Sequence, residues 1–293
     1  MGTIRNFRQA CGSLMGVGAL ALGLVGCSAS SSGTASDASS DSEIKAAIRI
    51  DPQAIEKVNT LFNMTPAAQQ AKEAAIAQCM QAKGLTWPAR LADQAFDIRS
   101  QFSPKPLSIE EAQQYGYQTQ NSNPEQDAPF VDDATWDAYT GSPENGNIAV
   151  EGIPGAIAKD GCLAQSYKEV FGSVETGVLF ESGILNLPLP YLNAAVADKR
   201  IVELDKQWAT CMKDQHGLEI ATPELAAVDT SMDSQQLAVY DAQCRQEVKY
   251  EEGATEVLNA YLTTFLADQQ GVIDQLTQAK QTAEKNAPVI LGK

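Results

Sequence analysis

Apolar residues at helical spacing first appear after Thr65-Pro66, a pair that is typical of a helix start. Threonine caps the first free N–H groups of a helix, and proline fits the first helical position. Up to residue 83 the apolar positions share one helical face: Ala71, Ala75, Ile76, Cys79 and Met80. Gly84 then favours a left-handed stop. The pattern predicts a helix over 66–83.

Residues 85–160 contain more than half of the prolines of the chain, so they predict short elements joined by loops. Ser108, followed by two acidic residues, indicates a short helix over 108–115. A second short helix is expected over 133–139. A third carries Cys162 and is stopped by a glycine.

Leu187-Pro188-Leu189-Pro190 interrupts the helical pattern and marks a boundary between two halves. A long helix is predicted after it, over 191–215. The apolar stripe of this helix comprises Ile201, Leu204, Trp208 and Cys211. Because Trp208 lies one turn before Cys211, we expect its ring to shield a disulfide at that cysteine.

Residues 234–286 contain no proline and repeat apolar residues every seven positions, with Glu251 as the exception. One heptad position holds Leu237, Cys244, Leu258, Phe265 and Val272, and a second holds Leu262 and Leu276. The spacing predicts one very long helix, or two helices broken near Gly253, that pack like a coiled coil. No segment favours a strand ladder, so the predicted fold class is all-α.

Four cysteines, Cys79, Cys162, Cys211 and Cys244, remain when Cys11 and Cys27 near the N-terminus are set aside. An even number of cysteines in an exported chain indicates two disulfides, and four cysteines allow three pairings. No C-x-x-C motif is present, so these cysteines are expected to be structural rather than redox-active or zinc-binding.

An internal repeat favours one of the three pairings. Residues 79–85 read Cys-Met-Gln-Ala-Lys-Gly-Leu, and residues 211–218 read Cys-Met-Lys-Asp-Gln-His-Gly-Leu. Each stretch is followed by one further cysteine on a helical pattern. The simplest interpretation is two related units, stapled by Cys79–Cys162 and by Cys211–Cys244. The pairings that join the two Cys-Met helices rank second.

The N-terminus has the layout of a secretory signal. Arg5 and Arg8 form a positive region, and an apolar stretch of about a dozen residues follows, too short to span a ~30 Å hydrocarbon core. Leu24-Val25-Gly26-Cys27 at its end resembles the lipobox of bacterial lipoproteins. That resemblance implies cleavage between Gly26 and Cys27 and lipidation of Cys27, which anchors the protein to the membrane. The alternative is an ordinary signal peptide that is cut nearby.

The segment after Cys27 is rich in Ser, Ala, Gly, Thr and Asp, which predicts a flexible tether with a reach of about 20 Å. Removal of Arg5 and Arg8 leaves 19 basic residues against 37 acidic ones, a net charge of −18. This charge argues against nucleic-acid binding and against general attraction to anionic lipids. It suits a solvated surface or, alternatively, the binding of cationic peptides or metal ions.

The predicted organisation has four parts. Residues 1–26 are a lipoprotein signal peptide, and residues 27–43 are the lipidated cysteine and the tether. Residues 44–187 form a first helical unit with a proline-rich insertion. Residues 188–293 form a second unit with the long C-terminal helix.

His216 is the single histidine of the chain, and the pattern places it at the end of the 191–215 helix. A histidine there gains from the helix dipole, which is a structural role. A catalytic role would require a nucleophile and an orienting partner, and no G-x-S-x-G or S-x-x-K motif supplies them. We therefore assign no catalytic, cofactor-binding or metal-binding residue.

Two other groups of residues deserve comparison with known chemistry. The adjacent acidic pairs are Glu110-Glu111, Asp132-Asp133 and Glu251-Glu252. The first two pairs fit helix starts, and the third fits an exposed helical stretch. The aromatic group is Tyr115, Tyr117, Trp136 and Tyr139. It could bind a sugar or a peptide, although core packing is the simpler use.

The order of these motifs resembles a set of actinobacterial exported lipoproteins, and the likeness covers most of residues 60–250. The matching segments are Cys79 to Gly84, Tyr115 to Tyr117, Trp136 to Gly141, Gly161-Cys162, Trp208 to Met212 and Asp241 to Arg245. Thr140 before Gly141 departs slightly from the pattern. The resemblance implies architecture and location, and it carries no known activity.

Three functions follow as hypotheses. The first is a non-enzymatic binding or interaction module, held by lipid on the outer face of the bacterial cytoplasmic membrane, with an envelope protein as partner. The second is the substrate-binding component of an uptake system, although such proteins have two α/β lobes that this pattern lacks. The third is a secreted hydrolase that uses His216 or an acidic pair.

Overall fold

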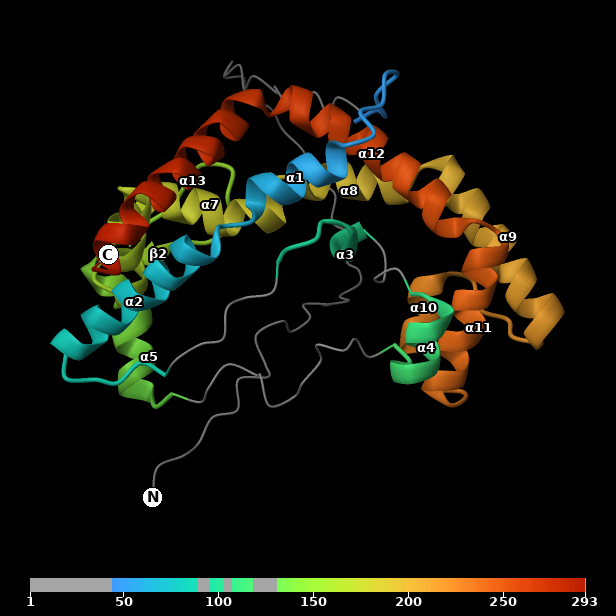
Figure 1. Ribbon diagram of the computed structural model, residues 1–293, viewed down its shortest axis with the longest axis horizontal. Coiled ribbons are helices and arrows are strands. Elements are labelled where there is room, and N and C mark those ends of the chain that lie inside the picture. The colour runs from blue at the N-terminus through green and yellow to red at the C-terminus, as the bar shows by residue number, and fades with distance from the viewer. Residues whose placement is uncertain (1–43, 89–94, 103–106, 118–130, 293) are drawn as a thin grey trace, which may run out of the picture. The chain divides into compact units, whose positions relative to one another are not determined.

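The computed structural model describes residues 44–88, 95–102, 107–117 and 131–292 (Figure 1). The predicted signal peptide, Cys11, Gly26, Cys27 and the tether lie outside these residues. The chain divides into two units, residues 1–42 and 43–293. The described residues all belong to the second unit.

The described residues form thirteen α-helices and one very short hairpin, so the all-α prediction is confirmed. The helices are α1 Ala54–Phe62, α2 Pro66–Ala82, α3 Arg99–Phe102, α4 Ile109–Tyr115, α5 Asp133–Thr140, α6 Cys162–Phe171, α7 Val174–Asn186, α8 Leu189–Val196, α9 Lys199–His216, α10 Pro223–Val228, α11 Ser234–Glu247, α12 Tyr250–Asp268 and α13 Gln270–Ile290. A 3-10 turn, η2 Pro143–Asn145, precedes the strands β1 Asn147–Ile148 and β2 Ile157–Ala158, which pair antiparallel.

Helix starts and stops in the first half follow the sequence signals. The Thr65 hydroxyl accepts a hydrogen bond from the N–H of Ala68 at 3.4 Å, with Pro66 at the first position of α2. Gly84 after this helix has a φ of +73°, in the left-handed region. Ser108 and Glu111 cap α4 reciprocally through side chain and backbone. These predicted helices are therefore confirmed.

The helix predicted over 191–215 is wrong in its continuity, because two helices, α8 and α9, occupy this stretch. Asp198 separates them in an extended conformation, and its carboxylate accepts the N–H of Arg200 at 2.9 Å. Asp198 caps a new helix here instead of continuing the preceding one. The spacing of the apolar residues does not distinguish these two outcomes.

The C-terminal segment is also divided differently from the prediction. It forms three helices, with breaks at Lys249 and Gln269 rather than near Gly253. Lys249 has a φ of +54°, the one positive φ at a non-glycine among the described residues. Gly253 lies inside α12, where a Cβ would come within 2.8 Å of Leu204. Its role is close packing rather than a turn.

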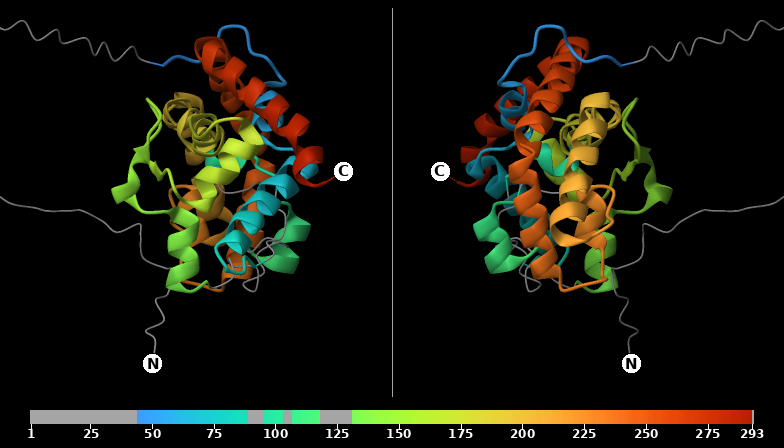
Figure 2. Two further views of the ribbon diagram at one scale, coloured as in Figure 1. Left: turned by 90° about the vertical axis from the view of Figure 1, so that its left-hand side faces the viewer. Right: turned by 90° about the vertical axis from the view of Figure 1, so that its right-hand side faces the viewer.

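The heptad pattern therefore does not produce one continuous coiled coil. α12 packs on α1, α8 and α9, whereas α13 packs on α2, α6 and α7. Figure 2 shows α13, in red, running beside α2. The apolar heptad residues are still mostly buried, because each of the three helices turns them toward a different neighbour. The predicted long C-terminal helix is present as α13, although it is shorter than expected.

The main core passes through both predicted helical units. Phe62 and Phe180 from the first half share one buried cluster with Leu258 and Phe265 from the second. A smaller cluster surrounds Cys79 and Cys162, and another joins α4 to α11.

Both predicted disulfides are confirmed. Cys79 bonds Cys162 with 5.6 Å between their Cα atoms, and Cys211 bonds Cys244 with 5.7 Å. The first links α2 to the first residue of α6, and the second links α9 to α11.

The repeat is visible at the first cysteine helix of each unit. The N–H of Leu85 donates to the carbonyl of Met80 at 2.9 Å, and the N–H of Leu218 donates to that of Met212 at 3.2 Å. In both cases the donor residue comes directly after a glycine whose backbone is in the left-handed region. The second cysteines differ, because Cys162 opens its helix whereas Cys244 lies near the end of α11.

Candidate functional site

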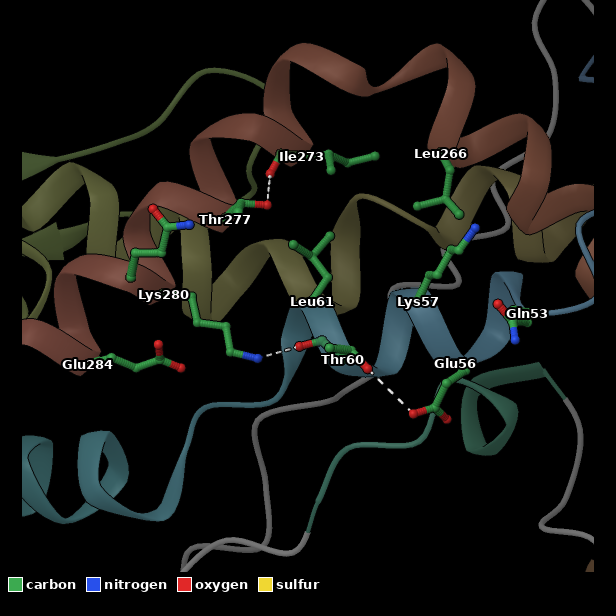
Figure 3. Close-up of a pocket in the computed structure, with 11 residues that line it drawn as sticks. Gln53, Glu56, Lys57, Thr60, Leu61, Leu266, Ile273, Thr277, Lys280 and Glu284 are labelled. Carbon is green, nitrogen blue, oxygen red and sulfur yellow. Dashed lines mark hydrogen bonds between the residues drawn. The ribbon is translucent and has the colours of Figure 1, made fainter.

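A groove of about 580 Å³ lies between α1 and the α12–α13 helices, and Figure 3 shows its walls. The volume falls within the usual range for ligand pockets. Eleven residues line it: Gln53, Glu56, Lys57, Thr60, Leu61, Leu266, Ile273, Thr277, Lys280, Gln281 and Glu284.

The apolar part of the groove comes from three side chains. Leu61 is the residue before the end of α1, while Leu266 and Ile273 lie on opposite sides of the break between α12 and α13. The N–H of Ile273 donates to the carbonyl of Gln269 at 2.9 Å, which starts α13 at once after the break. The break between α12 and α13 at Gln269, which the sequence pattern did not predict, therefore shapes this site.

The charged part of the groove contains cations and carboxylates together. Lys280 donates to the carbonyl of Thr60 at 2.6 Å, near the end of α1, where helix carbonyls lack partners. Lys57 pairs with Asp51 outside the lining. Glu56 accepts from the Thr60 hydroxyl at 3.4 Å. Apolar contact with mixed charges suits a polypeptide better than a single small ion.

A second notable site is a buried charge network between α9, α11 and α12. Arg245 is 2% exposed and Asp241 is 0% exposed. The Arg245 Nε donates to Oδ1 of Asp241 at 2.6 Å, and its Nη1 donates to Glu251 at 2.8 Å. Trp208 adds its indole N–H to Oδ1 of Asp241 at 3.0 Å.

Neighbouring aromatic groups complete this network. The Arg245 guanidinium lies 5.6 Å from the ring centre of Tyr250, whose hydroxyl donates to Asp205 at 2.8 Å. Burial acts to lower the pKa of the Arg245 guanidinium, but the adjacent Asp241 carboxylate outweighs it and raises that pKa. The network therefore holds a permanent buried cation, which suits a structural role.

His216 is the last residue of α9, as predicted. Its ring stacks on Tyr240 with centres 3.9 Å apart, and its Nε2 is buried without a hydrogen-bond partner among the described residues. Burial lowers the pKa of the imidazole below its usual value. A lowered pKa disfavours the charged ring, which is the form that interacts most strongly with the dipole at the C-terminal end of α9.

The acidic pairs lie in separate places. Glu111 belongs to the cap of α4, and Asp132 caps α5 by accepting the N–H of Thr135 at 2.7 Å. Glu251 was expected on an exposed stretch, and its side chain is indeed 40% exposed, but it also pairs with the buried Arg245. A six-residue spacing across a helix break hides this pair from the sequence.

The predicted aromatic group separates into two sites. Trp136 and Tyr139 lie together on α5, and Tyr139 stacks on Trp87 with ring centres 4.7 Å apart. Tyr117 instead packs beside the cluster of α4 and α11. Burial, together with the Asp241 carboxylate, raises the pKa of its hydroxyl. No single aromatic binding surface results from these residues.

In the described ranges, no three His, Cys, Asp or Glu side chains gather as ligands for a metal. Within the same ranges no helix has the length and apolar character to cross a bilayer. Comparisons with known proteins gave no significant match: neither a protein-family model, nor a curated sequence, nor a solved structure is significantly similar to this chain.

Proposed function

We propose that this protein is a lipid-anchored module of the bacterial cell envelope that binds a protein partner in the groove between α1 and α13. It acts outside the cytoplasmic membrane, and its own chain performs no reaction. The lipid on Cys27 supplies the attachment.

The anchoring part of the proposal rests on Leu24-Val25-Gly26-Cys27 and on the cysteine usage of the whole chain. Two disulfides are consistent with folding in an oxidising compartment outside the cytoplasm. Because the four described cysteines are bonded to one another in two pairs, none of them is a disulfide partner of Cys27.

The observation that carries the binding part is the composition of the groove. Leu61, Leu266 and Ile273 offer apolar contact, and Lys57 and Glu284 offer opposite charges on the same surface. A protein segment provides both kinds of contact, and apolar centres with charged rims are common in protein interfaces.

The two alternatives gain no support from the described residues. An uptake component would be expected to have two α/β lobes, and the strands present here are two residues long. A hydrolase would need a nucleophile beside His216, whose ring instead stacks on Tyr240.

Site-specific photo-cross-linking in cells tests the proposal. A photoreactive amino acid replaces Gln281, which lines the groove and is exposed, and a control replaces Val228, which is exposed on α10. The proposal predicts a discrete adduct with one envelope protein from position 281 and none from position 228. The same adducts from both positions, or none from position 281, would contradict binding in the groove.

A further inference from the structure

The chain enters the helical body through a short segment that is fixed to α12. The N–H of Ala47 donates to the carbonyl of Ala260 at 3.2 Å, and the Thr264 hydroxyl donates to the carbonyl of Lys45 at 2.8 Å. The N–H of Asp51 donates to the hydroxyl of Thr263 at 3.0 Å. Figure 1 shows this segment, in blue, beside α12. Segment 44–51 is therefore held in place rather than trailing from the body.

This fixed segment directs one apolar side chain away from the protein. Ile48 is 103% exposed, the highest value among the exposed large apolar residues of the described ranges. Ile44 and Ala46 on the same segment pack against the core. Ile44 and Ala46 therefore fix the segment to the helical body, whereas Ile48 is left in solvent. Exposure of an isoleucine to water is unfavourable.

The charge beside Ile48 is opposite to that of the whole body. Arg49 is exposed next to it, while Asp51, the nearest described acid along the chain, is neutralised by an ion pair with Lys57. The mature chain has a net charge of −18, so most of its surface is repelled by an anionic bilayer. An exposed arginine beside an exposed apolar residue makes this segment an exception.

The position of the segment in the chain supplies the third observation. Only residues 28–43 separate Cys27 from it, and even fully extended they span at most about 60 Å. A tether of this length keeps the segment near the anchored lipid at a millimolar effective concentration. A contact that is too weak to recruit a free protein can therefore be well populated here.

We propose that Ile48 and Arg49 form a docking point for the anionic surface of the bilayer in which the lipid is anchored. Ile48 enters the interfacial region, and Arg49 contacts lipid phosphates. The contact orients the helical body, because the rest of its acidic surface is kept away from the same membrane. This inference rests on the proposed lipid anchoring of Cys27.

A chemical anchor separates the docking test from the question of lipidation. In purified residues 27–293 with both disulfides formed, Cys27 is the remaining free thiol, so it couples to a maleimide lipid in vesicles. Ile48→Trp places a fluorophore at the docking point. Val289→Trp is the matched control, because Val289 is also exposed, at 80%, near the far end of α13.

Vesicles of phosphatidylcholine and phosphatidylglycerol with brominated acyl chains quench tryptophan that enters the interface. The inference predicts quenching of the added emission of Ile48→Trp, loss of that quenching when Arg49→Glu is added, and no quenching of the added emission of Val289→Trp. Equal quenching at positions 48 and 289, or quenching that Arg49→Glu leaves unchanged, would overturn it. Failure of lipidation in cells would appear separately, as an unmodified Cys27.

Discussion

The indole N–H of Trp208 donates to the Asp241 carboxylate at 3.0 Å, within a region that excludes solvent. The same oxygen accepts from Arg245, so a tryptophan of α9 and an arginine of α11 share one acceptor. Trp208 precedes Cys211 by one turn, and Arg245 follows Cys244. The polar network and the disulfide therefore join the same pair of helices, side by side.

Replacing Asp241 by Asn tests the strength of this network. The substitution keeps the size of the side chain but leaves Arg245 buried without its nearest counter-charge, so we expect a loss of about 3–5 kcal/mol in the free energy of unfolding. Urea unfolding followed by circular dichroism measures it. Glu219→Gln is the control, because Glu219 forms an exposed ion pair with Lys213. Loss of that pair should leave the free energy of unfolding unchanged within error. Equal stability of the two variants would contradict a structural network.

The two disulfides close loops of different length, with sequence separations of 83 for Cys79–Cys162 and 33 for Cys211–Cys244. Loop-closure entropy predicts stabilisation by about 4.5 and about 4 kcal/mol, respectively. Paired Cys→Ala variants, one for each bridge, should therefore both unfold at lower urea concentration than the parent. A bridge whose removal leaves the midpoint unchanged would contradict this account for that loop.

The close approach of α6 and α7 depends on Gly177, because a Cβ at this position would overlap the Tyr167 side chain. We expect Gly177→Ala to cost about 1–3 kcal/mol through overpacking. Gly271→Ala, in α13, is the matched control, because no atom lies within 4 Å of its Cβ position. Alanine there should stabilise the helix by roughly 0.5 kcal/mol. Thermal unfolding of both variants provides the comparison, and a neutral Gly177→Ala would show that the two helices can separate.

Asp198 links stability to pH at the start of α9. Its hydrogen bond with Arg200 acts against desolvation by burial and lowers the pKa of the carboxyl to about 2. A carboxyl with a depressed pKa in the folded state stabilises the protein above its unfolded pKa, and this stabilisation is lost as pH falls toward about 2. Asp198→Asn keeps a capping side chain but removes the titration.

The melting temperature of Asp198→Asn, compared with that of the parent from neutral pH down to the acid limit, measures this linkage. The difference between the two proteins should be largest above about pH 4 and should shrink as the pH falls. A difference that stays constant with pH would mean that the Asp198 charge does not contribute through its titration.

Sequence signals predicted local features of this fold well, for reasons that are themselves local. Thr65-Pro66, Ser108 and Gly84 act within one helical turn, so their capping roles are readable in the sequence. The disulfide pairing was also predictable, because two Cys-Met segments, each followed three or four residues later by Gly-Leu, indicate two related units.

The candidate groove was not predictable, because it depends on where helices break and which helices then meet. Gln269 ends α12 without a proline or a side-chain cap, and Gly271 lies inside the first turn of α13 rather than at the break, so the sequence does not place the change of direction. The pairing of Arg245 with Glu251 likewise needs the left-handed Lys249 between them. Tertiary packing selects such conformations against local preference.

Intact-mass analysis of the protein extracted from bacterial membranes tests the central claim most directly. We predict a mature chain that begins at Cys27, carries the added mass of a diacylglyceryl group on that residue, and keeps the other four mature cysteines as two disulfides. A chain that begins at another residue, or one with an unmodified Cys27 thiol, would contradict lipid anchoring.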